Sequence, residues 1–408
     1  MGMNETPSSE RIHISFFGCR NAGKSSLLNA VTGQDFAVVS NVKGTTTDPV
    51  KKSMELLPIG PVVIIDTPGM DDEGSLGELR MKKTRQILRQ TDIAVLVADS
   101  QAGIRKEDRD LIVLLKERKI PFLIALNKSE LGDLREEERG ELEKLSVPLV
   151  PVSAVTGAGI QELKEALTHL RKGEGDFPSV PLIGDLISPS DFVVLVVPID
   201  KASPKGRLIL PQQQTIRAIL DAGAVSITVR DDELEQTLSA LGKKPKLIVT
   251  DSQIFNRVKE IVPEDILLTS FSILFARYKG SLKAAAEGAA VLDQLKDGDR
   301  ILICEGCTHH RQCGDIGTEK LPLWIKNYTE KTLAFDFTSG ADFPDDLSPY
   351  RLIVHCGGCM LNEREMKYRQ SCAAAQKVPI TNYGIAIAHL NGILKRSVEP
   401  FPDIMDIV

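Results

Sequence analysis

The chain has 408 residues, which is enough for two or three domains at roughly 150 residues each. Its 56 acidic and 50 basic residues give a formal net charge of −6, which argues against a nucleic-acid-binding protein with a basic surface. The longest apolar run, Phe192 to Ile199, is too short to cross a bilayer. Because no secretory signal is visible either, we expect a cytoplasmic protein with neither a membrane nor a nucleic acid as its partner.

The first part of the chain alternates apolar, strand-like runs with helical stretches. Strands are predicted at residues 12–17, Val62–Asp66, Ile93–Ala98, Pro121–Leu126 and Val147–Val152. Helices are predicted at Leu76–Gln90, Lys106–Arg118 and Gly159–Arg171. Such alternation is typical of an α/β fold with a mainly parallel sheet. A polar, glycine-bearing segment at residues 172–176 then indicates a linker.

The middle of the chain repeats this alternation but has no cysteine or histidine between residues 175 and 270. Its predicted strands are Phe192–Val197, Val225–Val229 and Lys246–Thr250, and its predicted helices are Gln212–Ala222 and Asp232–Leu241. A small α/β module without such side chains is more typical of an interaction or spacer domain than of a catalytic one.

The last part begins near Ser270 and alternates once more. Its predicted strands are Arg300–Cys304 and Arg351–His355, the second reached through residues 333–337, and its predicted helices are Ala284–Leu295, Leu321–Lys331, Glu363–Gln376 and Ile385–Leu394. The sequence therefore predicts three α/β domains with mainly parallel sheets, over residues 1–174, 175–270 and 271–408.

A phosphate-binding pattern lies between the first predicted strand and the helix that follows it. Residues 18–25 (GCRNAGKS) match G-x-x-x-x-G-K-[ST]. Such a loop surrounds phosphates with backbone N–H groups at a helix N-terminus. Lys24 would reach the β- and γ-phosphates, and the Ser25 hydroxyl would bind Mg²⁺. This motif predicts a P-loop nucleotide-binding domain.

The motifs that follow indicate that the base of the nucleotide is guanine. Asp66 ends an apolar strand and can hold Mg²⁺ through water, and the Gly69 amide can sense the γ-phosphate. Residues 44–48 (GTTTD) lie between these motifs, as a switch loop does. Residues 127–130 (NKSE) and 153–154 (SA) each follow a predicted strand, where guanine-reading loops lie. This order of motifs predicts a GTPase.

Residues 10 to 171 resemble the GTPases of the TrmE or MnmE family of tRNA-modification enzymes, and Era. The resemblance implies that Thr46 is the switch-I magnesium ligand. It also implies that Asn21 helps to hold a potassium ion, which would neutralise charge between the β- and γ-phosphates; the alternative for Asn21 is a hydrogen bond that stabilises the loop. Met70 stands where a Ras-like enzyme has a water-orienting glutamine, so we expect slow hydrolysis. Glu130 replaces the usual aspartate but can still accept two hydrogen bonds from guanine.

The predicted nucleotide site therefore contains Gly18, Asn21, Ala22, Gly23, Lys24, Ser25, Ser26, Thr46, Asp66, Gly69, Asn127, Lys128, Glu130, Ser153 and Ala154. Within it, catalysis is assigned to Lys24, Thr46, Asp66 and Gly69, magnesium binding to Ser25 and Thr46, and potassium binding to Asn21.

The chain has seven cysteines and six histidines, and ten of these thirteen residues lie after residue 300. An odd number of cysteines in a large cytosolic chain is a poor disulfide framework, so this gathering predicts a metal site. One motif, residues 307–309 (CTH), follows the strand Arg300–Cys304, and the other, residues 355–359 (HCGGC), follows the strand Arg351–His355. If the two strands are parallel, both loops leave the same sheet edge.

Three thiolates, those of Cys307, Cys356 and Cys359, would converge there, and the two glycines would expose amides to sulfur. Spacing alone leaves two metals open: zinc with three cysteines and a histidine, or an iron–sulfur cluster with one exchangeable iron. The fourth ligand or an outer supporting residue would come from His309, His355 or Glu305, although Glu305 can also be an exposed loop charge. We expect Cys304, Cys313 and Cys372 to be bystanders.

A TrmE-like GTPase followed by an α/β module and a C-x-H…H-C-x-x-C domain resembles the HydF family, the maturation GTPases of FeFe-hydrogenase. The resemblance spans essentially the whole chain. It implies a 4Fe-4S cluster on Cys307, Cys356 and Cys359, and a scaffold that receives the diiron precursor of the H-cluster and delivers it to apo-hydrogenase. It also implies two radical-SAM maturases as partners, and a homodimer or higher oligomer formed through the middle module.

A second hypothesis is a GTP-regulated RNA-modification or ribosome-assembly factor with a structural zinc site. The acidic net charge and the lack of a stripe of basic and aromatic residues argue against it.

Overall fold

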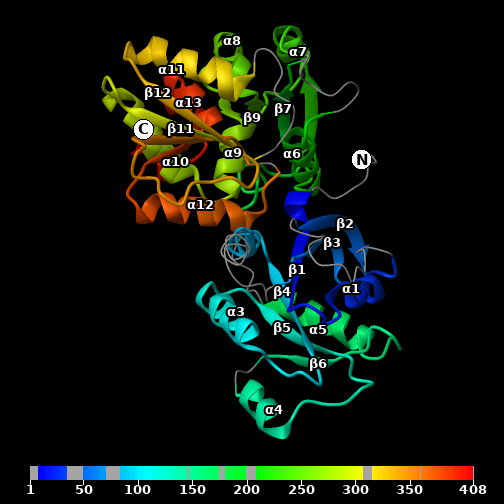
Figure 1. Cartoon of the computed structure of the whole chain (residues 1–408). Helices are drawn as coiled ribbons and strands as arrows, with labels where there is room; N and C mark the ends of the chain where they lie inside the picture. The colour runs from blue at the N-terminus through cyan, green and yellow to red at the C-terminus, as the bar shows by residue number, and fades with distance from the viewer. Residues whose placement is uncertain are drawn as a thin grey trace. The chain divides into compact units, whose positions relative to one another are not determined.

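The computed structural model of the chain describes residues 8–34, 49–69, 83–144, 147–173, 180–198, 208–306, 315–358 and 360–407 (Figure 1). It divides into two compact units, Met1–Phe177 and Pro178–Val408. Several predicted residues, among them Thr46, Met70, Cys307, His309, Cys313 and Cys359, lie outside the described residues.

The first unit is built on a six-stranded sheet in the order β2-β3-β1-β4-β5-β6, in which β2 runs antiparallel to β3 and the other neighbours are parallel. Its strands are β1 (Ile12–Phe17), β2 (Val50–Leu56), β3 (Gly60–Asp66), β4 (Ile93–Asp99), β5 (Phe122–Asn127) and β6 (Leu149–Pro151). Its helices include α1 (Lys24–Thr32), α3 (Lys106–Glu117), α4 (Glu136–Glu143) and α5 (Ile160–Gly173). Residues 83–89 of the helix predicted at Leu76–Gln90 are helical, and residues 76–82 lie outside the described part of the chain.

Apolar residues on both faces of this sheet explain its burial. On one face, strand residues pack with Leu27 of α1 and Leu163 of α5. On the other face, they pack with Leu111 of α3 and Leu142 of α4. A parallel sheet covered on both faces needs such continuous apolar strands. The predicted parallel α/β fold is confirmed here, whereas β2 was not predicted because its sequence, VKKSMEL, is a largely exposed edge.

The second unit contains two four-stranded parallel sheets, ordered β10-β9-β7-β8 and β12-β11-β13-β14. The elements around the first sheet are β7 (Phe192–Val196), α6 (Leu210–Asp221), β8 (Val225–Val229), α7 (Leu234–Ala240), β9 (Leu247–Thr250), α8 (Phe255–Ile261), β10 (Leu267–Ser270), α9 (Phe271–Tyr278) and α10 (Leu282–Ala289). Those around the second are β11 (Arg300–Glu305), α11 (Leu321–Thr329), β12 (Ala334–Ser339), β13 (Leu352–His355), α12 (Glu363–Ala375), β14 (Ile380–Asn382), α13 (Tyr383–Leu390), α14 (Leu394–Val398) and α15 (Pro402–Met405).

One hydrophobic core packs the first of these sheets against helices from the C-terminal part of the chain. It combines Val194 of β7 and Leu274 of α9 with Ala285 of α10, and it also takes in Leu394 and Phe401 from the C-terminal segment. Residues 178–408 therefore form a single compact unit although they hold two sheets. The predicted domain boundary at residue 270 falls inside this unit and stays a prediction.

The second sheet of this unit is covered by different helices on its two faces. Ile301 and Ile303 pack with Leu321 of α11, whereas Leu302 and Cys304 pack with Ala373 of α12. Figure 1 shows α11 and α12 on opposite sides of β11. Because successive side chains of a strand point to opposite faces, Glu305 at the end of β11 faces the α11 side and Cys304 faces the α12 side.

Within the described part of the chain, we find no helix that combines the length and the apolarity needed to span a bilayer.

Candidate functional site

The phosphate-binding loop joins β1 to α1, as its sequence predicts. A Cβ at Gly18 would lie 2.5 Å from the carbonyl oxygen of Val97, so only glycine lets the loop pass so close to β4. Gly23 caps α1 with φ of 81°, in the left-handed region that favours glycine. Asn21 also has a positive φ, 62°, which asparagine tolerates better than most residues, and its side chain is exposed.

Lys24, the first residue of α1, connects this loop to the end of β3. Its ammonium group donates to the Asp66 carboxylate and to the carbonyl oxygen of Thr67. Burial lowers the pKa of Lys24, and the Asp66 carboxylate opposes that shift. Thr67 is itself fixed, because its hydroxyl donates to the Phe16 carbonyl oxygen at 2.7 Å. The structure thus brings together the predicted phosphate-binding and magnesium-binding side chains.

Asn127, at the end of β5, connects three predicted loops of the nucleotide site. Its side-chain amide donates to the carbonyl oxygen of Ala22 at 2.9 Å and accepts the backbone N–H of Ala154 at 3.1 Å. Its Nδ2 lies so close to Gly23 that a Cβ there would be 2.2 Å away. Lys128 donates to Asp99 at 2.6 Å.

The remaining described members of the predicted nucleotide site lie on the same loops. Ser25 and Ser26 lie in the first turn of α1, Gly69 follows Thr67, Ser153 is buried after β6, and Glu130 is exposed. Their assignment to nucleotide binding stays a prediction.

The second predicted site lies at the carboxyl ends of β11 and β13. The two strands are parallel, with Cys304 opposite His355, so the condition for convergence of the two cysteine loops is met. The backbone N–H of Cys356 donates to the Cys304 carbonyl oxygen at 2.8 Å and extends the ladder by one residue. The Cys356 thiol accepts the N–H groups of Gly306 at 3.0 Å and of Gly358 at 3.4 Å. Amides that point at sulfur are typical of thiolates that bind iron–sulfur clusters.

His355 is buried on the α12 face, and both of its ring nitrogens have partners. Nδ1 lies 2.7 Å from the carbonyl oxygen of Cys356, which can only accept, so Nδ1 is the donor. Nε2 then accepts from Nη1 of Arg369 at 3.0 Å. Burial, with the positive charge of Arg369, lowers the pKa of His355 to about 3, so the ring stays neutral. This arrangement suits an outer support for Cys356 better than a metal ligand.

Arg369 is fully buried and holds this part of α12 in place. Its Nε donates to Glu365 at 2.8 Å, and its Nη2 donates to the carbonyl oxygen of Gly340 at 2.6 Å. A buried guanidinium is tolerated when its N–H groups are satisfied in this way. No motif marks Arg369 as a site residue; the sequence offers only its spacing of four residues from Glu365.

Glu305 is the last residue of β11 and is 6% exposed, so the alternative of an exposed loop charge is wrong. The strand runs one residue further than predicted and carries the carboxylate into the interior. A Cβ at Gly317 would lie 2.4 Å from Oε1 of Glu305 and 2.3 Å from the Tyr383 hydroxyl, so both groups crowd the same glycine. The Tyr383 hydroxyl is buried and has no hydrogen-bond partner among the described residues, and burial raises the pKa of Tyr383.

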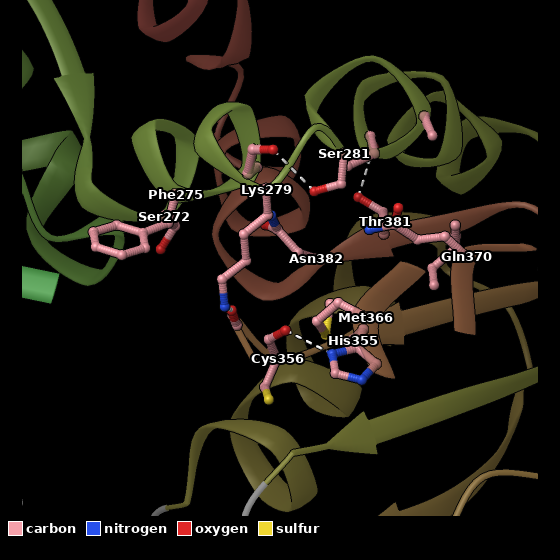
Figure 2. Close-up of a pocket in the computed structure, with 15 residues that line it drawn as sticks. Ser272, Phe275, Lys279, Ser281, His355, Cys356, Met366, Gln370, Thr381 and Asn382 are labelled. Carbon is pink, nitrogen blue, oxygen red and sulfur yellow. Dashed lines mark hydrogen bonds between the residues drawn. The ribbon is translucent and has the colours of Figure 1, made fainter. Parts of the chain in front are cut away.

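A small hollow opens beside the loop of Cys356 (Figure 2). Its lining includes Phe275 and Lys279 at the end of α9, Met366 of α12 and Asn382 of β14. Figure 2 shows Lys279 reaching from α9 toward this loop. Its Nζ donates to the carbonyl oxygens of Gly357 at 3.1 Å and Gly358 at 2.7 Å. Nothing in the local sequence marks Lys279 as a neighbour of the cysteine loop.

Cys304, Cys372 and His389 lie in surroundings that are typical of structural residues. Burial raises the pKa of Cys304 to about 12, which keeps it a thiol, and Cys372 packs at the edge of the same core. His389 pairs with Asp293 at 3.1 Å. Among the residues that the structure describes, no three histidine, cysteine or acidic side chains are grouped to hold a metal ion. Cys307, His309 and Cys359 are outside that set, so the predicted ligand set stays a prediction.

The first unit, with its phosphate loop, its Lys24–Asp66 contact and its Asn127 links, is a P-loop GTPase domain that hydrolyses GTP. Residues 13–128 match the family model of the 50S ribosome-binding GTPase. Residues 182–280 match the hydrogen maturase F dimerization domain, and residues 283–400 match the hydrogen maturase F tetramerization domain. The chain therefore belongs to the hydrogen maturase F family, HydF, which confirms the resemblance seen in the sequence.

Curated relatives match about two fifths of this chain. The tRNA modification GTPase MnmE of Nitrosomonas europaea is 37% identical over 159 residues, which cover 39% of this chain and 34% of that protein. MnmE of Heliobacterium modesticaldum is 34% identical over 167 residues, covering 40% of this chain and 35% of that protein. The chain thus spans about a third of the length of these relatives. Among solved structures, Era of Aquifex aeolicus is 20% identical with a TM-score of 0.36, covering 56% of this chain and 98% of that one.

Asn127→Ala removes the contacts from Asn127 to Ala22 and Ala154. Two or three lost hydrogen bonds, at roughly 1 kcal/mol each, should weaken GTP binding about 30- to 150-fold. Titration of a fluorescent GTP analogue measures the affinity, with Gln161→Ala on the exposed face of α5 as the control. Unchanged affinity in Asn127→Ala would show that this residue does not organise the site.

Cys304 should resist alkylation in the folded apoprotein. With a pKa of about 12, only about one thiol in ten thousand is a thiolate at pH 8. Treatment with iodoacetamide followed by peptide mass spectrometry should label Cys356, which is partly exposed, long before Cys304. Urea-unfolded protein serves as the control, since both cysteines should then react alike. Equal labelling of both in the folded protein would contradict the burial of Cys304.

Proposed function

We propose that this chain is a GTP-hydrolysing scaffold that binds a 4Fe-4S cluster and a diiron precursor, and delivers that precursor to apo-FeFe-hydrogenase during H-cluster assembly. The observation that carries this proposal is the Cys356 thiol at the end of β13, which accepts two backbone amides beside the start of the other cysteine loop. This sheet edge lies in a unit with both hydrogen maturase F domains, behind a GTPase domain.

The described residues fit such a cluster. The amides of Gly306 and Gly358 would stabilise a sulfur ligand at Cys356, and the Tyr383 hydroxyl, which has no hydrogen-bond partner in the described part of the chain, lies near the buried Glu305 carboxylate. Cys307, Cys356 and Cys359 would hold the cluster, with Glu305 or His309 as the fourth ligand and His355 as an outer support. The bound cluster would supply an iron position with an exchangeable ligand, suited to docking a second group.

The nucleotide site would use GTP with Mg²⁺, held by Ser25, Thr46 and Asp66. K⁺ near Asn21 would take the place of an arginine finger, and Met70 would leave basal hydrolysis slow because it cannot orient water. The exposed position of Asn21 leaves its side chain accessible to an ion at the phosphate loop.

The partners in this proposal are two radical-SAM maturases and the apo-hydrogenase, in the cytoplasm. The dimerization and tetramerization domains support a homodimer or a higher oligomer. GTP and GDP would favour different states of the switch loop around Thr46, and each state would bind the partners differently.

The similarity to MnmE proteins makes tRNA modification the alternative to the proposed function. Their similarity covers about two fifths of this chain and leaves about two thirds of each relative unmatched. The hydrogen maturase F tetramerization domain, by contrast, matches residues 283–400, which hold six of the seven cysteines. We therefore favour the maturation scaffold over an RNA factor with structural zinc.

Cys307→Ser and Cys356→Ser should each abolish cluster binding and hydrogenase maturation, because each removes a thiolate ligand. GTP hydrolysis should persist, since the GTPase domain is a separate unit. Iron and sulfide analysis after anaerobic reconstitution, followed by a GTPase assay, measures both effects. Cys372→Ser is the matched control and should keep its iron. Loss of both functions in the ligand variants would mean instead that the cysteines are needed for folding.

Replacing K⁺ with Na⁺ at constant ionic strength should slow GTP hydrolysis about 10-fold or more, because the smaller ion fits the loop less well than K⁺. Asn21→Ala should remove this ion dependence while GTP binding remains. Phosphate release measured in each salt tests both statements. If wild-type protein hydrolyses GTP at one rate in both salts, Asn21 only stabilises the loop.

A further inference from the structure

Three consecutive backbone carbonyls in the cysteine loop all accept hydrogen bonds from side chains. The Cys356 carbonyl accepts from His355 at 2.7 Å. The carbonyls of Gly357 and Gly358 accept from the single ammonium group of Lys279, at 3.1 and 2.7 Å. The backbone N–H groups of Gly306 and Gly358 instead donate to the sulfur of Cys356. The three carbonyl oxygens of the loop therefore lie on side-chain donors, while the N–H of Gly358 lies on the Cys356 sulfur.

Lys279 is well placed to hold this loop because its own helix is fixed. It caps the C-terminus of α9, and Ile273 and Leu274 of this helix are fully buried in the core around the first sheet. The lysine lies 78 residues before Gly357 in the sequence and inside the segment that matches the dimerization domain. A movement of α9 would therefore be transmitted to the two glycine carbonyls through one side chain.

We propose that Lys279 is a positioning residue for the cluster: it holds the Gly357 and Gly358 carbonyls away from the sulfur of Cys356 and so keeps the amides directed at it. This inference rests on the proposed function, in which Cys356 is a cluster ligand. A carbonyl oxygen turned toward a thiolate would repel it, whereas an amide N–H stabilises it. The same contact connects the segment that matches the dimerization domain to the cysteine loop.

The experiment compares Lys279→Met with wild-type protein, both reconstituted anaerobically and as the full chain. The methionine keeps the length of the side chain but cannot donate. Loss of an outer-shell partner typically costs 10- to 100-fold in metal affinity, so iron should pass to a chelator roughly 10-fold faster or more. The reduction potential from an EPR-monitored titration should also fall, because a nearby positive charge and the amide bonds to sulfur are lost.

Two further variants separate positioning from folding. Lys279→Arg keeps the charge and the donors and should recover slow iron release. Lys283→Met removes an exposed lysine of α10 and should behave like wild-type protein. Thermal unfolding and GTP hydrolysis should be alike in all four proteins. Equal iron release from wild-type and Lys279→Met protein overturns the proposal, and so does an arginine variant that loses iron as fast as the methionine variant.

A second readout does not need the cluster. In the apoprotein, amide hydrogen exchange of the peptide that contains Gly357 and Gly358 should be several-fold faster in Lys279→Met than in wild-type protein, because the loop has lost its anchor. If wild-type protein takes up no iron but this exchange difference is present, the proposed function fails and the positioning role of Lys279 stands. If exchange is unchanged, the positioning role fails whatever the iron content.

Discussion

The second unit depends on the parallel pairing of β11 with β13, in the register that sets Cys304 opposite His355. This register brings the ends of two distant strands level, so the loops that follow them leave the sheet at one place. It also decides which side chains face which helix. A slip of one residue would exchange the faces of every side chain on one strand and would turn His355 away from α12.

Near the ends of β11 and β13, the protein buries polar groups that do not contribute to a hydrophobic core. Arg369 is fully enclosed, which is unfavourable by several kcal/mol unless its N–H groups are satisfied. Glu365, His355 and the Gly340 carbonyl satisfy it. The result is a fixed, neutral His355 that holds the carbonyl of Cys356. Lys279 holds the next two carbonyls, so charged side chains on two helices define the conformation of one short loop.

The parts of the molecule that follow local rules could be predicted from the sequence. The phosphate loop, the parallel sheets and the shared edge of the two cysteine motifs depend on motif spacing and on apolar runs, and the structure bears out the fold. The exposed strand β2 lacks such a run and was missed. The roles of Arg369 and Lys279 depend on contacts across 14 and 78 residues, which no local pattern encodes. The sequence leaves Glu305 as either a ligand or an exposed loop charge, because burial of a carboxylate at a strand end cannot be seen in the sequence.

The central claim is that the edge of β11 and β13 holds an iron–sulfur cluster with one exchangeable position. Metal analysis and the EPR spectrum of the reduced, anaerobically purified protein, recorded with and without imidazole, test it most directly. We expect iron and sulfide in the ratio of a 4Fe-4S cluster, and a spectrum that shifts when imidazole is added. A colourless, folded protein with stoichiometric zinc would contradict it.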